Sequence, residues 1–288
     1  MRNPGFLIES RPHLDKPVLI AGFDGWGNAL NISKGMIAYL VGKFKARPFA
    51  RLNPDTFYRY DENRPLVNIR QGNLKSLKPP GGKFYAARTG ASPIDLVLLK
   101  ADEPGLAWYT FADELFSLCE DLGVETIITL GSMYDNVLHS DRIVSALASD
   151  PELFNRLKQK NVVPVSYQGP SAIHSVIQSE GAGRGFKCVS LWCHCPYYLQ
   201  GVTHFGIMSH LASLLGCLGG FEMDVADLQD GWEELNTRIQ ELIKTSPELE
   251  AAINKLRKAK LRGSWEKMKT AAGDDQKVIH LQDFLEPK

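Results

Sequence analysis

The sequence has no net charge, no long hydrophobic run and no recognisable targeting segment. Its 33 Lys and Arg balance 33 Asp and Glu, so electrostatics gives no reason to expect a nucleic acid or an acidic membrane as partner. The longest apolar stretch, residues 211–221, falls well short of the roughly 20 residues that span a bilayer. The first ten residues lack the apolar core of a signal peptide. We therefore expect a cytoplasmic protein without a membrane segment.

The sequence contains few cysteines, and their number is odd. Five cysteines in 288 residues argue against a disulfide framework. Cys188, Cys193, His194 and Cys195 lie close together in the sequence. If they share one strand, Cys193 and Cys195 face one way while Cys188 and His194 face the other. The ligands of a zinc site must converge, so we interpret these cysteines as buried thiols and expect no metal and no cofactor.

Several catalytic and phosphate-binding motifs are missing. Leu30 stands where a dinucleotide fingerprint would need its third glycine, and no Gly-Lys-Ser/Thr follows the glycine-rich segment at residues 22–28. No Gly-x-Ser-x-Gly and no His-Glu-x-x-His occur anywhere in the chain. A nucleophile-elbow hydrolase and a zincin are therefore disfavoured, and the sequence assigns no catalytic residue.

Short apolar runs alternate with segments of helical spacing. Strands are expected at residues 18–21, 94–99, 124–130, 162–166 and 186–192, and helices at 29–44, 108–122, from about 171, and 202–218. Such alternation predicts an α/β fold, a three-layer sandwich whose central sheet is mostly parallel and carries helices on both faces.

Three further regions differ from this α/β core, which we place at residues 1–220. Residues 53–93 are rich in proline and glycine, which predicts a hairpin or loop insertion. Apolar residues at helical spacing predict a helical hairpin over residues 221–262, whose seam packs on its own domain or on a second subunit. We favour its own domain. Residues 263–288 are expected to be a weakly ordered tail.

Ligands of parallel α/β sheets bind outside the carboxyl ends of the strands. The segment 22–28 follows the first predicted strand and opens a helix, so its glycines either admit a ligand or form a tight turn. Asp24 in this segment and Asp135 after another predicted strand can each act as an acid or base, or as a turn residue. Gly131-Ser132 ends another predicted strand. The candidate ligand-binding residues, with the strand-end residue His194, are Gly22, Asp24, Gly25, Trp26, Gly27, Asn28, Gly131, Ser132 and His194.

Several of these segments together resemble the PAC2 family, which is named after a proteasome assembly chaperone. The resemblance covers most of residues 15–260. It rests on Gly22-Phe23 and Gly25-Trp26-Gly27, on the segment 54–65 with Arg64-Pro65, and on Glu103-Pro104, which precedes Trp108, Phe111 and Leu122-Gly123-Val124. The helical hairpin after Phe221 is similar to that of the bacterial long form.

The resemblance implies a fold similar to the nucleoside phosphorylases and a phosphorylase/hydrolase-like core. Gly131-Ser132 and Gly169-Pro170 match segments of those enzymes, but Ser171-Ala172-Ile173 replaces the residues that grip base and ribose. The segment Trp192–Cys195 likewise replaces a Met-Ser/Thr strand end. Phosphorolysis is therefore not expected, and these departures favour a protein that is not an enzyme.

The resemblance favours an assembly-type, protein-binding factor without catalysis. Eukaryotic relatives hold proteasome subunits, some through a hydrophobic-Tyr-x tail that the ending Leu285–Lys288 lacks. We expect a homo-oligomer, with a trimer as the first guess. The alternative is an enzyme or sensor that binds a nucleoside-like or anionic ligand at the candidate residues. An exposed apolar face at Trp232, Ile239 or Leu256 would favour a protein partner.

Overall fold

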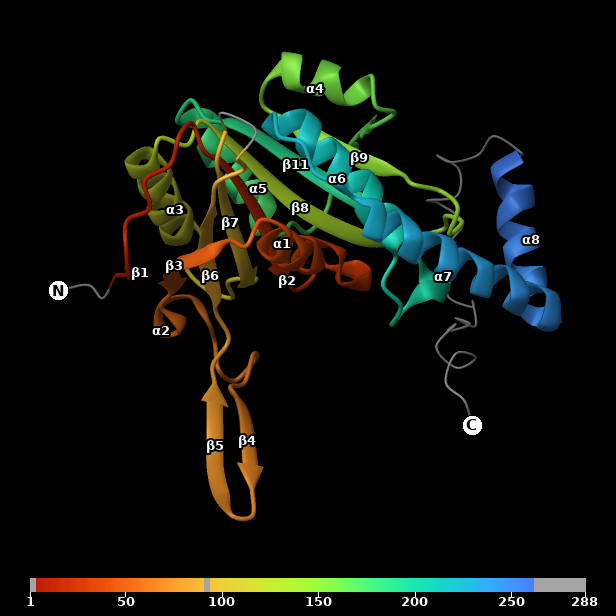
Figure 1. Cartoon of the computed structure of the whole chain (residues 1–288), viewed down its shortest axis with the longest axis horizontal. Helices are drawn as coiled ribbons and strands as arrows, with labels where there is room; N and C mark the ends of the chain where they lie inside the picture. The colour runs from red at the N-terminus through yellow and green to blue at the C-terminus, as the bar shows by residue number, and fades with distance from the viewer. Residues whose placement is uncertain (1–3, 91–93, 262–288) are drawn as a thin grey trace.

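The computed structural model describes residues 4–90 and 94–261, and within them nine strands form one twisted sheet (Figure 1). The four central strands β7, β2, β8 and β11 run parallel, and antiparallel pairs flank them on both sides. This confirms the predicted α/β class and brings the carboxyl ends of four strands to one edge. In spatial order the strands are β1 (Phe6–Ile8), β3 (Arg47–Leu52), β6 (Gly82–Ala87), β7 (Leu96–Asp102), β2 (Val18–Asp24), β8 (Thr126–Asp135), β11 (Lys187–Pro196), β9 (Val144–Ala148) and β10 (Val163–Pro164).

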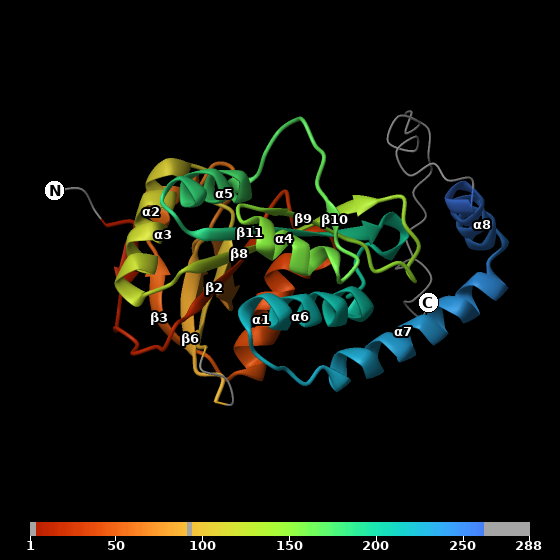
Figure 2. The ribbon, with the colours of Figure 1, turned by 90° about the horizontal axis from the view of Figure 1, so that it is seen from above.

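Helices cover both faces of the sheet and make two separate hydrophobic cores (Figure 2). We call these sides the α1 face and the α5 face. The α1 face carries α1 (Ile32–Lys43), α4 (Pro151–Lys158) and α6 (Phe205–Gly219), and the α5 face carries α2 (Pro54–Phe57), α3 (Trp108–Leu122) and α5 (Ile173–Gly183). No helix within the described residues is long and apolar enough to cross a membrane.

Helix α3 shows how the local sequence sets the element. Phe111, Leu115 and Phe116 recur at helical spacing and are fully buried against the α5 face. Gly123 ends the helix with φ +73°, a left-handed conformation that favours glycine. The predicted helix and its predicted end are therefore confirmed.

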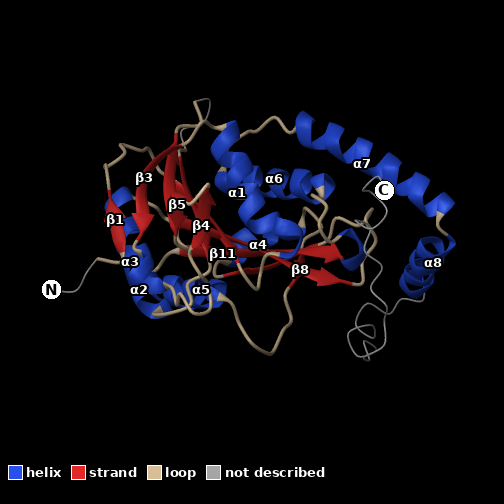
Figure 3. Ribbon diagram, turned by 90° about the horizontal axis from the view of Figure 1, so that it is seen from below, coloured by secondary structure: helices blue, strands red, loops and turns tan. Residues whose placement is uncertain are grey.

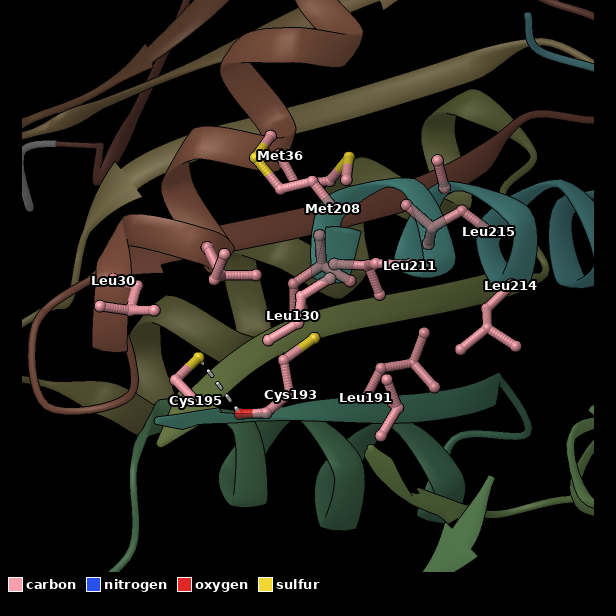
Figure 4. Packing of buried hydrophobic residues seen from close by; sticks show 14 of the residues in the cluster. Leu30, Met36, Leu130, Leu191, Cys193, Cys195, Met208, Leu211, Leu214 and Leu215 are labelled. Atoms are coloured by element: carbon pink, nitrogen blue, oxygen red, sulfur yellow. Dashed lines mark hydrogen bonds between the residues drawn. The ribbon is translucent and has the colours of Figure 1, made fainter. Parts of the chain in front are cut away.

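The cysteines of β11 alternate between the two faces as the strand period requires. Cys193 and Cys195 lie on the α1 face in the same hydrophobic core as Leu130 and Leu211 (Figure 4), whereas Cys188 belongs to the core of the α5 face. Burial raises the pKa of the Cys193 thiol to about 12, so it stays protonated. Within the described residues, no group of three or more His, Cys, Asp or Glu side chains could hold a metal ion.

The structure corrects three sequence-based expectations. Strand β8 does not end at Gly131 but continues to Asp135, because its parallel partner β11 extends the ladder to Pro196. The strand expected at residues 162–166 shrinks to the two residues of β10, and the helix after it begins at Ile173. The predicted hairpin or loop insertion at 53–93 does contain a hairpin, at residues 66–78, but it also contains β6, which lies inside the central sheet between β3 and β7.

Strands β4 (Leu66–Arg70) and β5 (Asn73–Lys78) form a hairpin that projects away from the core (Figure 1). Its turn residues Gln71 and Gly72 both have positive φ, as a tight two-residue hairpin turn requires. Val67 lies opposite Leu77, and Ile69 lies opposite Leu74. These four side chains share one face, which we call the apolar hairpin face. The opposite face carries Leu66 and the polar residues Asn68, Arg70, Asn73, Ser76 and Lys78, and we call it the polar face.

The C-terminal part consists of α7 (Ala226–Thr245) and α8 (Pro247–Leu261), which extend beyond the sheet (Figure 3). Helix α7 packs on α6, where the Trp232 ring stacks on His204 at 4.9 Å between ring centroids. Ile239 of the same seam is fully buried in the core of the α1 face. The seam therefore contacts its own chain. The boundary at residue 220 stays a prediction, and the tail at 263–288 lies outside the described residues.

Candidate functional site

Gly22, the first of the candidate glycines, lies inside β2 rather than in the loop that follows it, and it is needed for packing. A Cβ at Gly22 would lie 2.5 Å from the carbonyl oxygen of Ser33 in α1, which is a severe clash. The Ser33 hydroxyl is buried there, accepts a 3.0 Å hydrogen bond from the Phe23 amide and donates to the carbonyl of Leu130. Gly22 thus lets α1 approach β2 and β8 closely, which is a structural role.

The rest of this loop is held together by its own polar groups. Asn28 donates to Asp24 at 2.9 Å and accepts from the Lys34 amide at 3.2 Å. The Lys34 ammonium lies 2.9 Å from Asp24 and 2.7 Å from Asp102 at the ends of β2 and β7. Burial raises the pKa of Asp24, but the hydrogen bonds from Lys34 and Asn28 outweigh it and lower this pKa. The Lys34 amide, in the first turn of α1, is thus already bonded within the loop.

Glu103, from the Glu103-Pro104 pair noted in the sequence, holds two segments of the site together. Its carboxylate accepts the backbone amide of Ile173, the first residue of α5, at 2.9 Å, and that of Trp26 at 3.3 Å. A Cβ at Gly25 would lie 2.8 Å from the same carboxylate. Glu103 therefore caps α5, complements the positive end of its dipole and ties the loop to it. A negative charge already occupies this helix end, which opposes an anionic ligand there.

Two further glycines make room for an indole on the α5 face. A Cβ at Gly131 would lie 2.6 Å from the Trp192 ring, and one at Gly27 would lie 3.1 Å away. Trp192 also contacts the buried ring of His174 at 4.9 Å between centroids and the exposed ring of Trp26 at 6.3 Å. Trp26 is 64% exposed. The loop after β2 thus borders an aromatic surface on β11 rather than a phosphate cradle.

The predicted ligand-binding residues do not all meet. Ser132 points to the α1 face, where its hydroxyl is buried and donates to the carbonyl of Ala29 at 2.8 Å. His194 lies on the α5 face with Trp192, because alternate residues of a strand share a side. The segment 22–28, which comprises the end of β2 and the loop after it, adjoins Gly131 and Ser132 through the bridge between Asn28 and Ser132. Ligand binding by this set stays a prediction.

His194 joins two side chains from neighbouring strands. Its Nδ1 lies 2.7 Å from a carboxylate oxygen of Asp135 at the end of β8. Its Nε2 lies 2.9 Å from the hydroxyl of Ser145 in β9. His194 and Ser145 are both buried, while the Asp135 side chain is one quarter exposed. We call this chain of hydrogen bonds the Asp135–His194–Ser145 relay.

The relay borders an apolar part of the α5 face. Ser145 lies directly opposite Trp192 in the β9–β11 ladder and opposite Val163 in the β9–β10 ladder. Leu147, two residues further along β9, is 47% exposed, and Val163 is 39% exposed. Side chains at such positions point to the same side of the sheet. The relay is thus adjacent to a surface that accepts apolar groups.

Sequence reasoning found only part of this arrangement. Asp135 was predicted as an acid, base or turn residue at a strand end, and His194 was a candidate. Ser145 carried no signal, because it lies in a strand that the apolar pattern did not reveal. The pairing of β8, β11 and β9, which no short motif records, brings the three side chains together.

The fold makes this an α/β protein with helices on both faces of a central sheet whose inner strands are parallel. Sequence comparison gives its family. The model of the PAC2 family matches residues 19–243. The chain belongs to the PAC2 family, which confirms the resemblance. A comparison with curated proteins finds no match.

Solved structures agree with this assignment. A PAC2 family protein from Streptomyces avermitilis is 28% identical, with a TM-score of 0.70 over 78% of this chain and 95% of its own. A proteasome-assembly chaperone homologue from Mycobacterium tuberculosis is also 28% identical, with a TM-score of 0.73 over 82% and 99%. An archaeal proteasome activator from Pyrococcus furiosus is 19% identical, with a TM-score of 0.62 over 82% and 97%, and shares the fold.

Proposed function

We propose that this PAC2 family protein is a protein-binding assembly factor that acts as a homo-oligomer and needs no chemistry for that role. The observation that carries the proposal is the apolar hairpin face. Its four residues, Val67, Ile69, Leu74 and Leu77, are 54–61% exposed. A contiguous exposed apolar patch marks an interaction surface.

The hairpin needs a partner for its own stability. A two-stranded hairpin is at best marginally stable in water unless further strands or a packed surface support it. In the described structure β4 and β5 pair only with each other. Strand β5 is protected against further pairing by a bulge at Lys75 and by Lys78. The outer edge of β4 lacks such protection over residues 66–69, so it can accept a strand of another chain.

Relatives support the assembly role. The Mycobacterium tuberculosis relative is a proteasome-assembly chaperone homologue, and the fold is shared with an archaeal proteasome activator. Both descriptions refer to the proteasome. We extend this family-level role to the present chain, with a second and third copy of the chain as the first partners.

The mass in solution tests self-association. Light scattering should give a trimer, three times the 32.0 kDa of one chain. Ile69→Lys places a charge in the apolar hairpin face and should shift the mass to that of a monomer. Asn68→Lys is the matched control, because it adds the same charge to the polar face one residue away and should leave the mass unchanged.

Cross-linking in cells tests the wider assembly role. The wild type and Asn68→Lys should be captured with subunits of one larger complex, and Ile69→Lys should lose them. Self-association that is unchanged in Ile69→Lys would remove the hairpin from the proposal. Capture of the same subunits by all three proteins would show that another surface binds them.

A small-molecule site near the aromatic surface is the second candidate. The buried Nδ1 of His174, next to Trp192, has no hydrogen-bond partner in the described part of the chain. A thermal-shift screen with nucleosides, nucleotides and phosphate tests it, because ligand binding raises the melting temperature by mass action. Trp26→Ala is the test variant, because Trp26 is exposed, whereas Asn28 holds the loop together. A shift that Trp26→Ala abolishes supports the site, and no shift with any compound argues against it.

A further inference from the structure

We propose that Ser145 is the nucleophile of a hydrolytic site that cleaves esters of apolar acyl groups, with His194 as general base and Asp135 as the positioning residue. The proposal is independent of the protein-binding role. It rests on the relay geometry and on the apolar surface beside it. The sequence lacks the Gly-x-Ser-x-Gly motif, so the site is defined by its geometry alone.

The distances match the roles. A nucleophile and its base must lie within hydrogen-bond reach, about 2.6–3.2 Å, and a third group must orient the base. Ser145 Oγ lies 2.9 Å from His194 Nε2, and Asp135 lies 2.7 Å from His194 Nδ1. The same order of hydroxyl, imidazole and carboxylate recurs on unrelated folds, where geometry and roles identify it rather than sequence position.

Asp135 sets which ring nitrogen of His194 carries the proton. A carboxylate beside Nδ1 favours the tautomer with the proton on Nδ1, which leaves the Nε2 lone pair facing Ser145. The carboxylate also stabilises the imidazolium that forms when Nε2 takes the proton. Because His194 is buried with Ser145, water competes little for this hydrogen bond.

The neighbouring side chains indicate the substrate class. Trp192, Val163 and Leu147 lie on the same side of the sheet as Ser145, and none of them carries a charge. An apolar acyl chain can lie along these residues with its carbonyl carbon near Ser145. Ser145 itself is only 4% exposed, so a small acyl group is favoured over a bulky one.

The reaction balances with water as the second substrate. Ser145 Oγ bonds to the carbonyl carbon while its proton passes to His194 Nε2. The bond between that carbon and the alcohol oxygen breaks, and the alcohol leaves with the proton from Nε2. Water then attacks the acyl carbon and gives a proton to His194 Nε2. The bond between that carbon and Ser145 Oγ breaks, Nε2 returns its proton to Oγ, and the carboxylic acid leaves.

An alkyl fluorophosphonate tests the nucleophile in one covalent step. Attack by Ser145 forms an oxygen–phosphorus bond and expels fluoride. Intact-mass measurement of the full chain should show one adduct, and peptide mapping should place it on Ser145. Ser145→Ala and His194→Gln should both lose it. Ser209→Ala removes a buried hydroxyl on α6 and should keep it. Melting temperatures show that each variant is folded.

Asp135→Asn separates positioning from a purely structural role. It should lower the labelling rate by on the order of 10⁴-fold, and the remaining rate should rise in alkaline solution, where Ser145 loses its proton without His194. A wild-type chain that takes no label, while a serine hydrolase labels under the same conditions, would overturn the proposal. So would a label that persists in folded Ser145→Ala, or a labelling rate that Asp135→Asn leaves unchanged at every pH.

Discussion

The β4–β5 hairpin and helix α7 are both amphipathic elements at the margin of the molecule, but only one of them is covered. The sequence drew attention to α7, whose seam holds Trp232 and Ile239. In the structure Ile239 is fully buried and Trp232 packs against α6, whereas Ile69 in the hairpin is 61% exposed. The same residue type thus stabilises the fold in one place and offers a contact surface in the other.

The difference comes from what lies next to each element. Helix α6 presents Gly206 to α7, and a Cβ there would lie 2.7 Å from the Trp232 ring. Close approach of two helices is therefore built into the chain. The hairpin contacts no such surface within the described residues. An amphipathic pattern shows that one face of an element tends to be buried. Whether the same chain buries that face depends on the surface next to the element.

The largest contrast should come from one substitution made in both regions. Ile239→Ala leaves a cavity in the core and should reduce the free energy of unfolding by about 2–5 kcal/mol. Ile69→Ala removes exposed atoms and should change it by less than about 0.5 kcal/mol. Urea titrations at a concentration where the chain is monomeric measure both. Equal losses would show that the hairpin is covered by its own chain.

The contact between α6 and α7 should be sensitive to a single methyl group. Gly206→Ala drives a Cβ against the Trp232 ring, and overpacking of this kind typically costs about 1–3 kcal/mol. Urea unfolding measures the loss. Combining it with Trp232→Leu should recover part of that stability, because the smaller side chain leaves room. If the double variant is as unstable as the sum of both changes, the two residues do not share one contact.

Acid should weaken the α7 region and spare the hairpin. Burial lowers the pKa of His204, which stacks on Trp232, and that of His139, which contacts Gln240 of α7, each to about 4. The unfolded chain takes up these protons near pH 6.5 and the folded chain only near pH 4. Stability is therefore complete above about pH 6.5 and falls as the pH drops toward 4.

Unfolding measured between about pH 7 and pH 4.5 should show this decline, and His204→Gln should make it smaller. Residues 66–78 contain no Asp, Glu or His. The mass of the oligomer should therefore stay constant over the part of this range in which the chain remains folded. Dissociation before any loss of structure would point to an interface that contains one of the histidines.

The smallest effect is expected for Trp26, which is exposed but isolated from both regions. Trp26→Ala removes an edge-to-face contact with Trp192 and should alter the free energy of unfolding by no more than about 0.5 kcal/mol. It should also leave the mass in solution unchanged. A change of mass would extend the interface from the hairpin to the strand-end loop.

The strand-end loop shows where sequence reasoning stops. Its glycines were equally consistent with a ligand and with a tight turn. The structure gives Gly22 a packing role against Ser33 and gives Gly27 and Gly131 a role in seating Trp192. It also shows Glu103 at the start of α5, a contact between residues 70 positions apart. Spacing along the chain carries no information on such contacts.

The sequence by itself determined the α/β class, the helix that ends at Gly123, the alternation of the cysteines in β11 and the family, because these depend on local periodicity and short segments. Only the tertiary structure decided that β8 runs on to Asp135, that β6 joins the central sheet, and that Ser145 meets His194. These features depend on which strands pair and in what register, and pairing is fixed by the joint burial of residues far apart in the chain.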